Sequence, residues 1–266
     1  MYLTHFGFTH YPFERDLQQD ELFASTSLGE AHARLNHLVE LRGIGLITGE
    51  VGSGKTTACR QLAASLHTGL YRFLYVALST GNVMDIYKSI SCELGLPIER
   101  SRSLAFLSIQ TEITRLATES RQLPILVVDE AHHLRNEVLE DLRLLTNYAM
   151  DAERRLCLLL VGLTELRRRL AMAVHESLEQ RIVVNYHFAG FTPEEVPAYL
   201  SHRLQLAGCT LPLFEPPAIA ALFQASNGLP RKLNRTAHYA LSAAALAKSQ
   251  RVNAEHVQIA LDEFRP

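Results

Sequence analysis

The nine residues "GEVGSGKTT", Gly49–Thr57, decide the fold. They match the spacing G-x-x-x-x-G-K-[S/T], follow an apolar run and precede a stretch with helical spacing. Glycines in this pattern let backbone N–H groups curl around phosphates, and the positive end of the next helix faces the same ligand. We expect Lys55 to reach the β and γ phosphates and Thr56 to ligate Mg²⁺. The predicted nucleotide-binding residues are Gly49, Glu50, Val51, Gly52, Ser53, Gly54, Lys55, Thr56 and Thr57.

Five short runs rich in Ile, Val, Leu and Phe alternate with longer stretches of helical spacing. Such runs are typical of a buried parallel sheet with helices on both faces. The sequence therefore predicts an α/β fold, a P-loop NTPase with three α/β/α layers and five parallel strands. The strand runs are Ile44–Thr48, Phe73–Leu78, Pro124–Asp129, Leu156–Gly162 and Ile182–Phe188.

Beyond "GFTPEEV", Gly190–Val196, the strand runs stop and Ala-rich helical patterns follow. Thr192 can cap a helix whose first position holds Pro193. We expect a nucleotide-binding α/β domain with an N-terminal extension over residues 1–190, and a small helical lid domain over 191–266. The predicted lid helices are Val196–Leu206, Ala218–Ala225, Arg231–Ala247 and Ala254–Phe264.

Bulk composition sets limits on location and partners. A formal net charge of −2 over 266 residues means that any surface for nucleic acid must come from local clusters of Arg and Lys. The four cysteines form no C-x-x-C pair, which favours reduced thiols over disulfides or a zinc site. The chain has no basic start followed by an apolar run, and no apolar run of about 18 residues. We expect a cytoplasmic protein without a membrane partner.

A second motif, "ILVVDEAHHL", Ile125–Leu134, supplies two carboxylates at the end of a buried strand. Ligands of α/β sheets bind at the carboxyl ends of the strands. We expect Asp129 to hold Mg²⁺ and Glu130 to polarise the attacking water. Two adjacent buried carboxylates without a cation would be costly.

The histidines of the same stretch suggest a metal site less clearly. His132 and His133 are adjacent, and no third ligand stands at a useful spacing, so capping or core roles are favoured. "HESLE", His175–Glu179, resembles half of a zinc-protease helix, but Glu179 stands where the second His should be.

Together these motifs resemble an AAA+ ATPase, nearest to the ExeA/GspA-type group among the ORC1-like "DEAH" AAA+ ATPases. The resemblance rests on the glycine loop, on "ILVVDEAHHL", and on "GLPRKLN", Gly228–Asn234. It extends to the opening "FGFTHYPFERD" and to "LRLLTNYAMD", Leu142–Asp151. The chain is also similar to ATP-dependent helper proteins of transposons. The resemblance implies ATP and Mg²⁺ as ligands and ATP hydrolysis as the activity.

The resemblance also assigns roles to arginines. Arg231 matches the lid arginine that senses the γ-phosphate, and Arg181 in "LEQRI", Leu178–Ile182, matches an arginine finger that completes a neighbouring subunit's site. Solvated surface roles remain alternatives for both. Leu163 replaces the polar residue expected after the fourth strand, which leaves Thr164 as the nearest substitute and suggests a slow, switch-like ATPase.

Two other enzyme classes fit less well. Helicases named for D-E-A-H close ATP between two RecA-like domains, and residues 189–266 are too few for a second one. A small-molecule kinase would use the glycine loop but would not explain Glu130 or the pattern at Arg231.

The expected function is an ATP-dependent switch that assembles as a ring or filament, on DNA, in support of transposition or recombination. Residues 216–254 contain no Asp or Glu but five basic residues, and "LRRRL", Leu166–Leu170, adds another basic cluster. Solvated helix faces and subunit contacts are alternative explanations. Secretion-type relatives continue into a membrane segment, whereas this chain ends at Pro266, so we expect support of transposition ahead of secretion. The alternative function is an ATPase related to the general secretion pathway that acts on a protein partner. A transposase, another recombination protein or a secretion component each remain possible partners.

Overall fold

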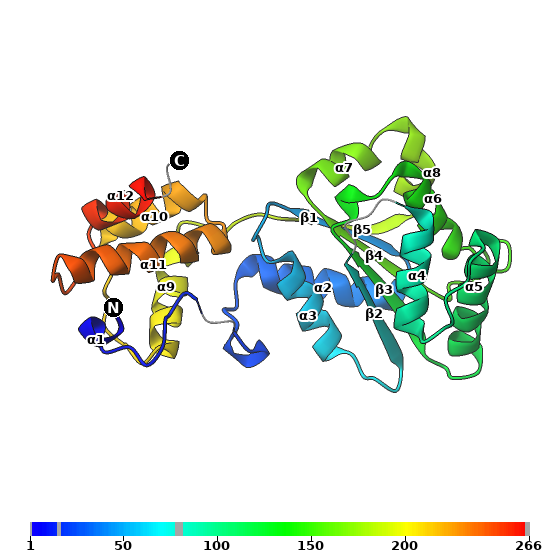
Figure 1. Cartoon of the computed structure of the whole chain (residues 1–266), viewed down its shortest axis with the longest axis horizontal. Coiled ribbons are helices and arrows are strands. Elements are labelled where there is room, and N and C mark those ends of the chain that lie inside the picture. The colour runs from blue at the N-terminus through cyan, green and yellow to red at the C-terminus, as the bar shows by residue number, and fades with distance from the viewer. Residues whose placement is uncertain (1, 15–16, 78–81, 264–266) are drawn as a thin grey trace. The chain divides into compact units, whose positions relative to one another are not determined.

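The computed structural model describes residues 2–14, 17–77 and 82–263 (Figure 1). The chain forms two compact units. The sheet unit contains residues 30–50 and 55–188, and the helical unit contains residues 1–29, 51–54 and 189–266.

The sheet unit is built on five parallel strands in the order β2-β3-β4-β1-β5. All residues of β1, β3 and β4 are buried, as the apolar runs predict. The predicted α/β class and the parallel sheet are confirmed, while Leu78 of the second predicted run lies outside the described residues. The strands are β1 (Ile44–Gly49), β2 (Tyr71–Ala77), β3 (Leu123–Asp129), β4 (Cys157–Gly162) and β5 (Ile182–Phe188).

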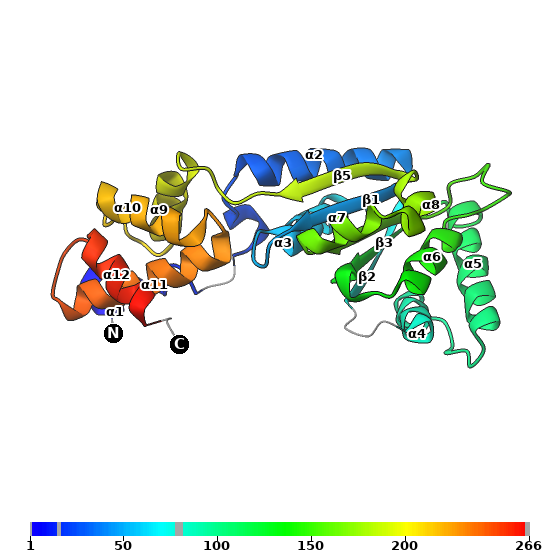
Figure 2. The same cartoon turned by 90° about the horizontal axis from the view of Figure 1, so that it is seen from above.

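Helices cover both faces of this sheet. Leu38 of α2 (Thr26–Leu41) lies against Gly45 of β1, and α3 (Lys55–Ser65) begins directly after the glycine loop. An apolar core lies on the face of the sheet opposite to α2. Figure 2 shows α4, α5 and α6 on this face, across the sheet from α2. The elements on that face are α4 (Val83–Leu94), α5 (Arg102–Thr118), η2 (Ala131–His133), α6 (Asn136–Leu145), α7 (Thr164–Leu170), η3 (Ala173–His175) and α8 (Glu176–Glu179).

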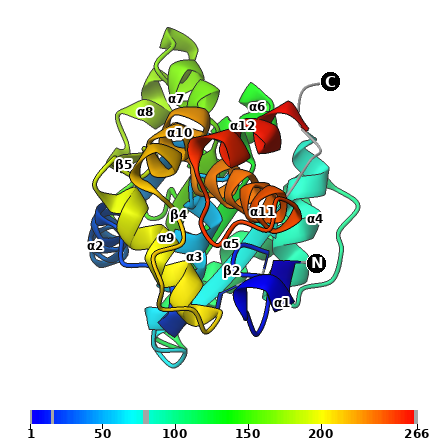
Figure 3. The ribbon, with the colours of Figure 1, turned by 90° about the vertical axis from the view of Figure 1, so that its left-hand side faces the viewer.

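The helical unit has its own apolar core, as the Ala-rich patterns predict. Leu200, Leu222, Leu233 and Leu241 are buried there with almost no exposed surface. Its four long helices face the viewer in Figure 3: α9 (Glu195–Leu206), α10 (Pro216–Ser226), α11 (Pro230–Leu246) and α12 (Ala254–Asp262). The predicted end of the last helix, Phe264, lies outside the described residues.

The N-terminal extension packs with these helices. It contains α1 (Tyr2–Phe6) and η1 (Gln19–Glu21). The Tyr2 hydroxyl is 3.0 Å from Nδ1 of His238, and Arg203 donates a 2.7 Å hydrogen bond to the carbonyl of Pro12. The sequence assigns this extension to the sheet domain, whereas in the structure its aromatic side chains enter the core of the helices. Arg15 and Asp16 of the quoted opening lie outside the described residues, and the boundary between 190 and 191 stays a prediction.

Glu195, at the start of α9, also binds the first residue of α2, Thr26, which belongs to the same unit. The amide of Glu195 donates to Oγ1 of Thr192 (3.3 Å), and the amide of Thr192 donates to Oε2 of Glu195 (3.0 Å), which is the reciprocal pattern of a capping box. Oε1 of Glu195 accepts a 2.7 Å bond from the amide of Thr26, the first residue of α2. Burial raises the pKa of Glu195, but the bonds from Thr192 and Thr26 outweigh burial and lower this pKa.

Replacing this glutamate should destabilise the protein. Glu195→Ala removes a charged acceptor shared by two orphan amides, so we expect a loss of about 1–2 kcal/mol in the free energy of unfolding by urea at pH 7. Because the folded-state pKa is lowered, this stabilisation is present above the ordinary glutamate pKa of about 4.3 and is lost as the pH falls through the lower folded value. Glu194→Ala, at an exposed neighbour, is the matched control. Equal midpoints for the two variants would contradict the capping role.

Candidate functional site

The glycine loop connects β1 to α3 and takes a conformation that its sequence dictates. Gly52 and Gly54 have φ values of +76° and +110°, which only glycine adopts without strain. A Cβ atom at Gly52 would also lie 2.3 Å from Cβ of Arg231, which belongs to the same compact unit as residues 51–54. The two glycines are therefore required by backbone angle, and Gly52 by space as well.

Polar groups of the loop and of the first turn of α3 fit a phosphate chain. Lys55 is buried, and its ammonium donates to the carbonyls of Gly49 (3.0 Å) and Glu50 (2.9 Å). The hydroxyl of Ser53 is buried and has no hydrogen-bond partner. A buried ammonium, an unpaired hydroxyl and a helix N-terminus suit a polyanion.

Asp129, the last residue of β3, is buried with 4% of its surface exposed. Its Oδ2 accepts hydrogen bonds from the Thr56 hydroxyl (3.2 Å) and the Tyr75 hydroxyl (2.6 Å). Its Oδ1 accepts from the amide of Glu130 (2.8 Å). The structure thus brings together the two predicted magnesium ligands, and this hydroxyl and carboxylate are the oxygen donors that a hard cation takes. Their role as ligands stays a prediction.

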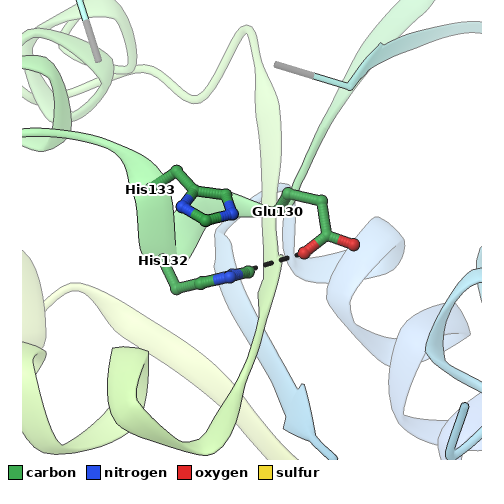
Figure 4. A group of neighbouring side chains, drawn as sticks. All are labelled: Glu130, His132 and His133. Atoms are coloured by element: carbon green, nitrogen blue, oxygen red, sulfur yellow. Dashed lines mark ion pairs between the residues drawn. The ribbon is translucent and has the colours of Figure 1, made fainter. Parts of the chain in front are cut away.

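Glu130 has an environment opposite to that of Asp129. Its backbone is left-handed (φ +54°, ψ +31°), and its side chain is 52% exposed. Its Oε2 lies 3.4 Å from Nδ1 of His132 (Figure 4). An exposed carboxylate next to a buried, fixed one is suited to act on water, and this role also stays a prediction.

Thr164 is linked to the glycine loop. It begins α7 just after β4, and its hydroxyl donates a 2.8 Å hydrogen bond to Oε1 of Glu50. Leu163 supplies no side-chain cap to this helix. The contact couples the end of β4 to the loop, while the assignment of Thr164 as the water-orienting residue remains a prediction.

The two predicted arginines lie in different units, Arg181 in the sheet unit and Arg231 in the helical unit. Arg181 directly precedes β5 and forms a bidentate ion pair with Asp151 (2.7 and 3.0 Å). The glycine loop follows the carboxyl end of β1, whereas Arg181 precedes the amino end of β5. Because the two strands are parallel, Arg181 and the glycine loop lie at opposite ends of the strands. Arg231, near the start of α11, is exposed, and its amide donates to the carbonyl of Gly52 (3.3 Å) within the helical unit.

Sequence reasoning missed Tyr75. In the sheet it pairs with Val127, two residues before Asp129, so its long side chain reaches along the strand to the carboxylate. Burial and the bond to Asp129 raise the pKa of Tyr75 and keep its hydroxyl protonated as a donor. Burial, followed by the charge of Asp129, raises the pKa of the nearby Cys59 to about 12, so this thiol is neutral and unreactive. All four cysteines are free, as expected.

Comparison with known proteins identifies the family. The model of a family described as "AAA domain" matches residues 38–170, which is half of the chain. The chain belongs to this AAA family. A curated relative, General secretion pathway protein A of Aeromonas hydrophila, is 36% identical over 256 residues. The match covers 95% of this chain and 46% of that protein, so the chain spans less than half the length of this relative.

Solved structures share the fold. Cdc6p from Pyrobaculum aerophilum has a TM-score of 0.70 at 17% identity, with 95% of this chain and 70% of that chain covered. The Aeropyrum pernix ORC1 protein, solved in complex with DNA, has a TM-score of 0.68 at 18% identity, covering 96% and 69%. The Thermotoga maritima RuvB Holliday junction branch migration motor has a TM-score of 0.57 at 19% identity, covering 95% and 73%.

Membership of the AAA family makes ATP the substrate and Mg²⁺ the metal ion, while the glycine loop and Asp129 remain the predicted site for them. The predicted AAA+ ATPase class is therefore confirmed. Over residues 2–14, 17–77 and 82–263, no helix is long and apolar enough to span a membrane.

Tyr75→Phe should weaken the response to magnesium. The change removes the 2.6 Å bond that orients Asp129, and a hydrogen bond to a charged group contributes about 1.5–3 kcal/mol. We expect the Mg²⁺ concentration for half-maximal ATP hydrolysis to rise about tenfold or more, with ATP binding in EDTA unchanged. Tyr71→Phe on the same strand is the control, because the Tyr71 hydroxyl has no hydrogen bond in the described structure. A wild-type magnesium response in Tyr75→Phe would show that Asp129 keeps its orientation without the phenol.

Proposed function

We propose that this AAA+ ATPase is an ATP-driven switch that assembles with further copies of itself and acts on DNA. The observation that carries the catalytic part is the pairing of the buried Asp129 with Thr56, beside the exposed Glu130. Such a division of environments suits one carboxylate for a metal and the other for water.

Each residue of the site has a separate role in the proposed hydrolysis of ATP. The loop amides and Lys55 hold the phosphates, and Thr56 and Asp129 hold the metal ion. Bound Mg²⁺ would neutralise charge on the β and γ phosphate oxygens. Glu130 orients water and takes its proton, Thr164 fixes Glu50 at the loop, and Arg231 senses the γ-phosphate from the helical unit.

Two substitutions test these roles. Glu130→Gln should bind ATP as the wild type does and lose about 100-fold or more of its turnover, because general bases contribute on this scale. Lys55→Ala should weaken ATP binding about tenfold or more, because a buried charged hydrogen bond to phosphate is lost. Fluorescent-nucleotide binding and phosphate release measure the two effects, with the exposed Glu40→Gln as control. Normal turnover by Glu130→Gln would exclude Glu130 as the base.

Arg181 supports the assembly part of the proposal. It precedes β5, at the opposite end of the parallel strands from the glycine loop of its own chain. In this proposal it therefore acts on a nucleotide held by another copy of the chain. Its bidentate pair with Asp151 holds the guanidinium in a fixed orientation. An arginine finger of this kind stabilises charge on the transferred phosphoryl group.

The charge of the helical unit supports DNA as the surface on which copies assemble. Residues 216–254 hold no acidic residue, and the basic residues among them are all exposed: Arg231, Lys232, Arg235, Lys248 and Arg251. Basic side chains on one unit bind phosphate backbones without reading sequence. A support role in transposition or recombination, with a transposase as partner, fits such binding.

A protein partner from a secretion system is the second candidate. It is favoured by the 36% identity to General secretion pathway protein A, over a match that covers 46% of that protein. In this case ATP would drive the same assembly, with the partner replacing DNA.

Assembly measured with ATP, ADP and a non-hydrolysable analogue separates these functions. We expect larger species and DNA binding with ATP or the analogue only, and affinity that falls steeply with salt. Arg181→Ala should lower ATP turnover in the assembled state about tenfold or more while ATP binding persists. Arg115→Ala, in a surface pair with Glu112, is the control. Lys248→Glu with Arg251→Glu should weaken DNA binding. A monomer indifferent to DNA with all three nucleotides would overturn the DNA proposal.

A further inference from the structure

The turn after β3 gathers three side chains that sequence spacing did not suggest as a group. Glu130, His132 and His133 each present one ligand atom, and these atoms all lie within 4.8 Å of one another (Figure 4). Glu130 is the third ligand that spacing along the chain does not reveal. The set therefore has the donor chemistry of a two-histidine, one-carboxylate metal site.

Backbone conformation explains why adjacent residues converge here. Glu130 is left-handed, and residues Ala131–His133 follow as the short 3-10 helix η2. The amide of His133 donates to the carbonyl of Glu130 (3.0 Å), which closes the turn. The two imidazole rings lie over one another, with centroids 4.0 Å apart, and the carboxylate of Glu130 lies beside them (Figure 4).

An unpaired nitrogen marks the centre of this group. The side chain of His132 is 4% exposed, and its Nδ1 has no hydrogen-bond partner among the residues that the structure describes. This atom lies 3.4 Å from Oε2 of Glu130, outside the geometry of a hydrogen bond. A buried polar atom without a partner is costly, and a metal ion is one partner that would satisfy it.

We propose that Glu130, His132 and His133 bind a transition-metal ion of the Zn²⁺ class. Zinc bound tetrahedrally at about 2.1 Å requires ligand atoms about 3.4 Å apart. The separation of Glu130 Oε2 and His132 Nδ1 is 3.4 Å, and side-chain rotation closes the remainder of the 4.8 Å cluster. Imidazole nitrogens select zinc over magnesium, which prefers oxygen ligands in an octahedron. The zinc site is thus distinct from the site of Thr56 and Asp129.

Zinc bound at this position inhibits ATP hydrolysis. This consequence rests on the proposed role of Glu130, because a carboxylate that ligates zinc cannot accept a proton from water. The glycine loop, Lys55, Thr56 and Asp129 contribute no ligand to the cluster. Zinc therefore blocks hydrolysis and leaves ATP binding intact, so that the protein is held in its ATP-bound form.

Direct binding of the metal alone tests the site. Zn²⁺ is titrated into the full chain, without nucleotide, in competition with a chromophoric chelator, and Co²⁺ absorption reports tetrahedral coordination. We expect one tight site in the wild type and affinity at least about tenfold weaker in His133→Ala and in Glu130→Gln, both exposed positions. His37→Ala is the matched control, because His37 faces Glu40 on α2 as an exposed pair without a third ligand. Equal zinc affinity in the wild type and His133→Ala would overturn the proposal.

Inhibition is then measured as the ratio of each protein's ATPase rate with Zn²⁺ to its own rate with a chelator, at constant Mg²⁺. Zinc should lower the ATPase rate of the wild type and of His37→Ala at least about tenfold. The same zinc concentration should lower the ATPase rate of His133→Ala only slightly. Tight zinc binding in a chain without any ATPase activity would contradict the proposed function but not the metal site. Equal inhibition by zinc of the active wild type and of active His133→Ala would overturn the proposed inhibition through this site, but not the metal site itself.

Discussion

The fixed carboxylate of Asp129 is the interaction on which the site depends. A buried charge must be balanced by donors, and Asp129 takes them from α3 (Thr56), from β2 (Tyr75) and from the next peptide (Glu130). These bonds tie the end of β3 to a neighbouring strand and to the helix that follows the glycine loop. Asp129 therefore fixes the end of β3 relative to β2 and to the first turn of α3, which is where we propose that the metal ion binds.

One rotated peptide separates the roles of two neighbouring carboxylates. A strand continued past Asp129 would send the next side chain to the other face of the sheet. The left-handed backbone at Glu130 ends the strand instead, leaving its carboxylate exposed and close to the histidines of η2. The same left-handed residue therefore carries the carboxylate that we propose as the base and begins the turn that brings His132 and His133 close to it.

The sequence predicts those features whose causes are local. Five apolar runs become five parallel strands, and the glycine spacing becomes a loop, because hydrophobic period and positive φ are properties of a few neighbouring residues. The sequence does not predict features that depend on tertiary packing. In the sequence Tyr75 has the pattern of an ordinary strand residue. Its hydrogen bond to Asp129 can be inferred only when the strand register is known. The aromatic N-terminus reads as an extension of the nearest domain, and its partner helices lie more than 180 residues away in the chain.

This last feature affects how the protein is made. Tyr2 contacts His238 across a sequence separation of 236 residues, so parts of the helical unit lie on both sides of the sheet unit along the sequence. During synthesis the sheet unit is complete once residue 188 has emerged. The aromatic side chains of residues 2–14 then still lack α11, their packing surface, because this helix begins only at Pro230. Closing so long a loop makes folding of the helical unit later than folding of the sheet unit, and a nascent chain exposes Tyr2, Phe8 and Phe13 to chaperones or to aggregation until α11 has emerged.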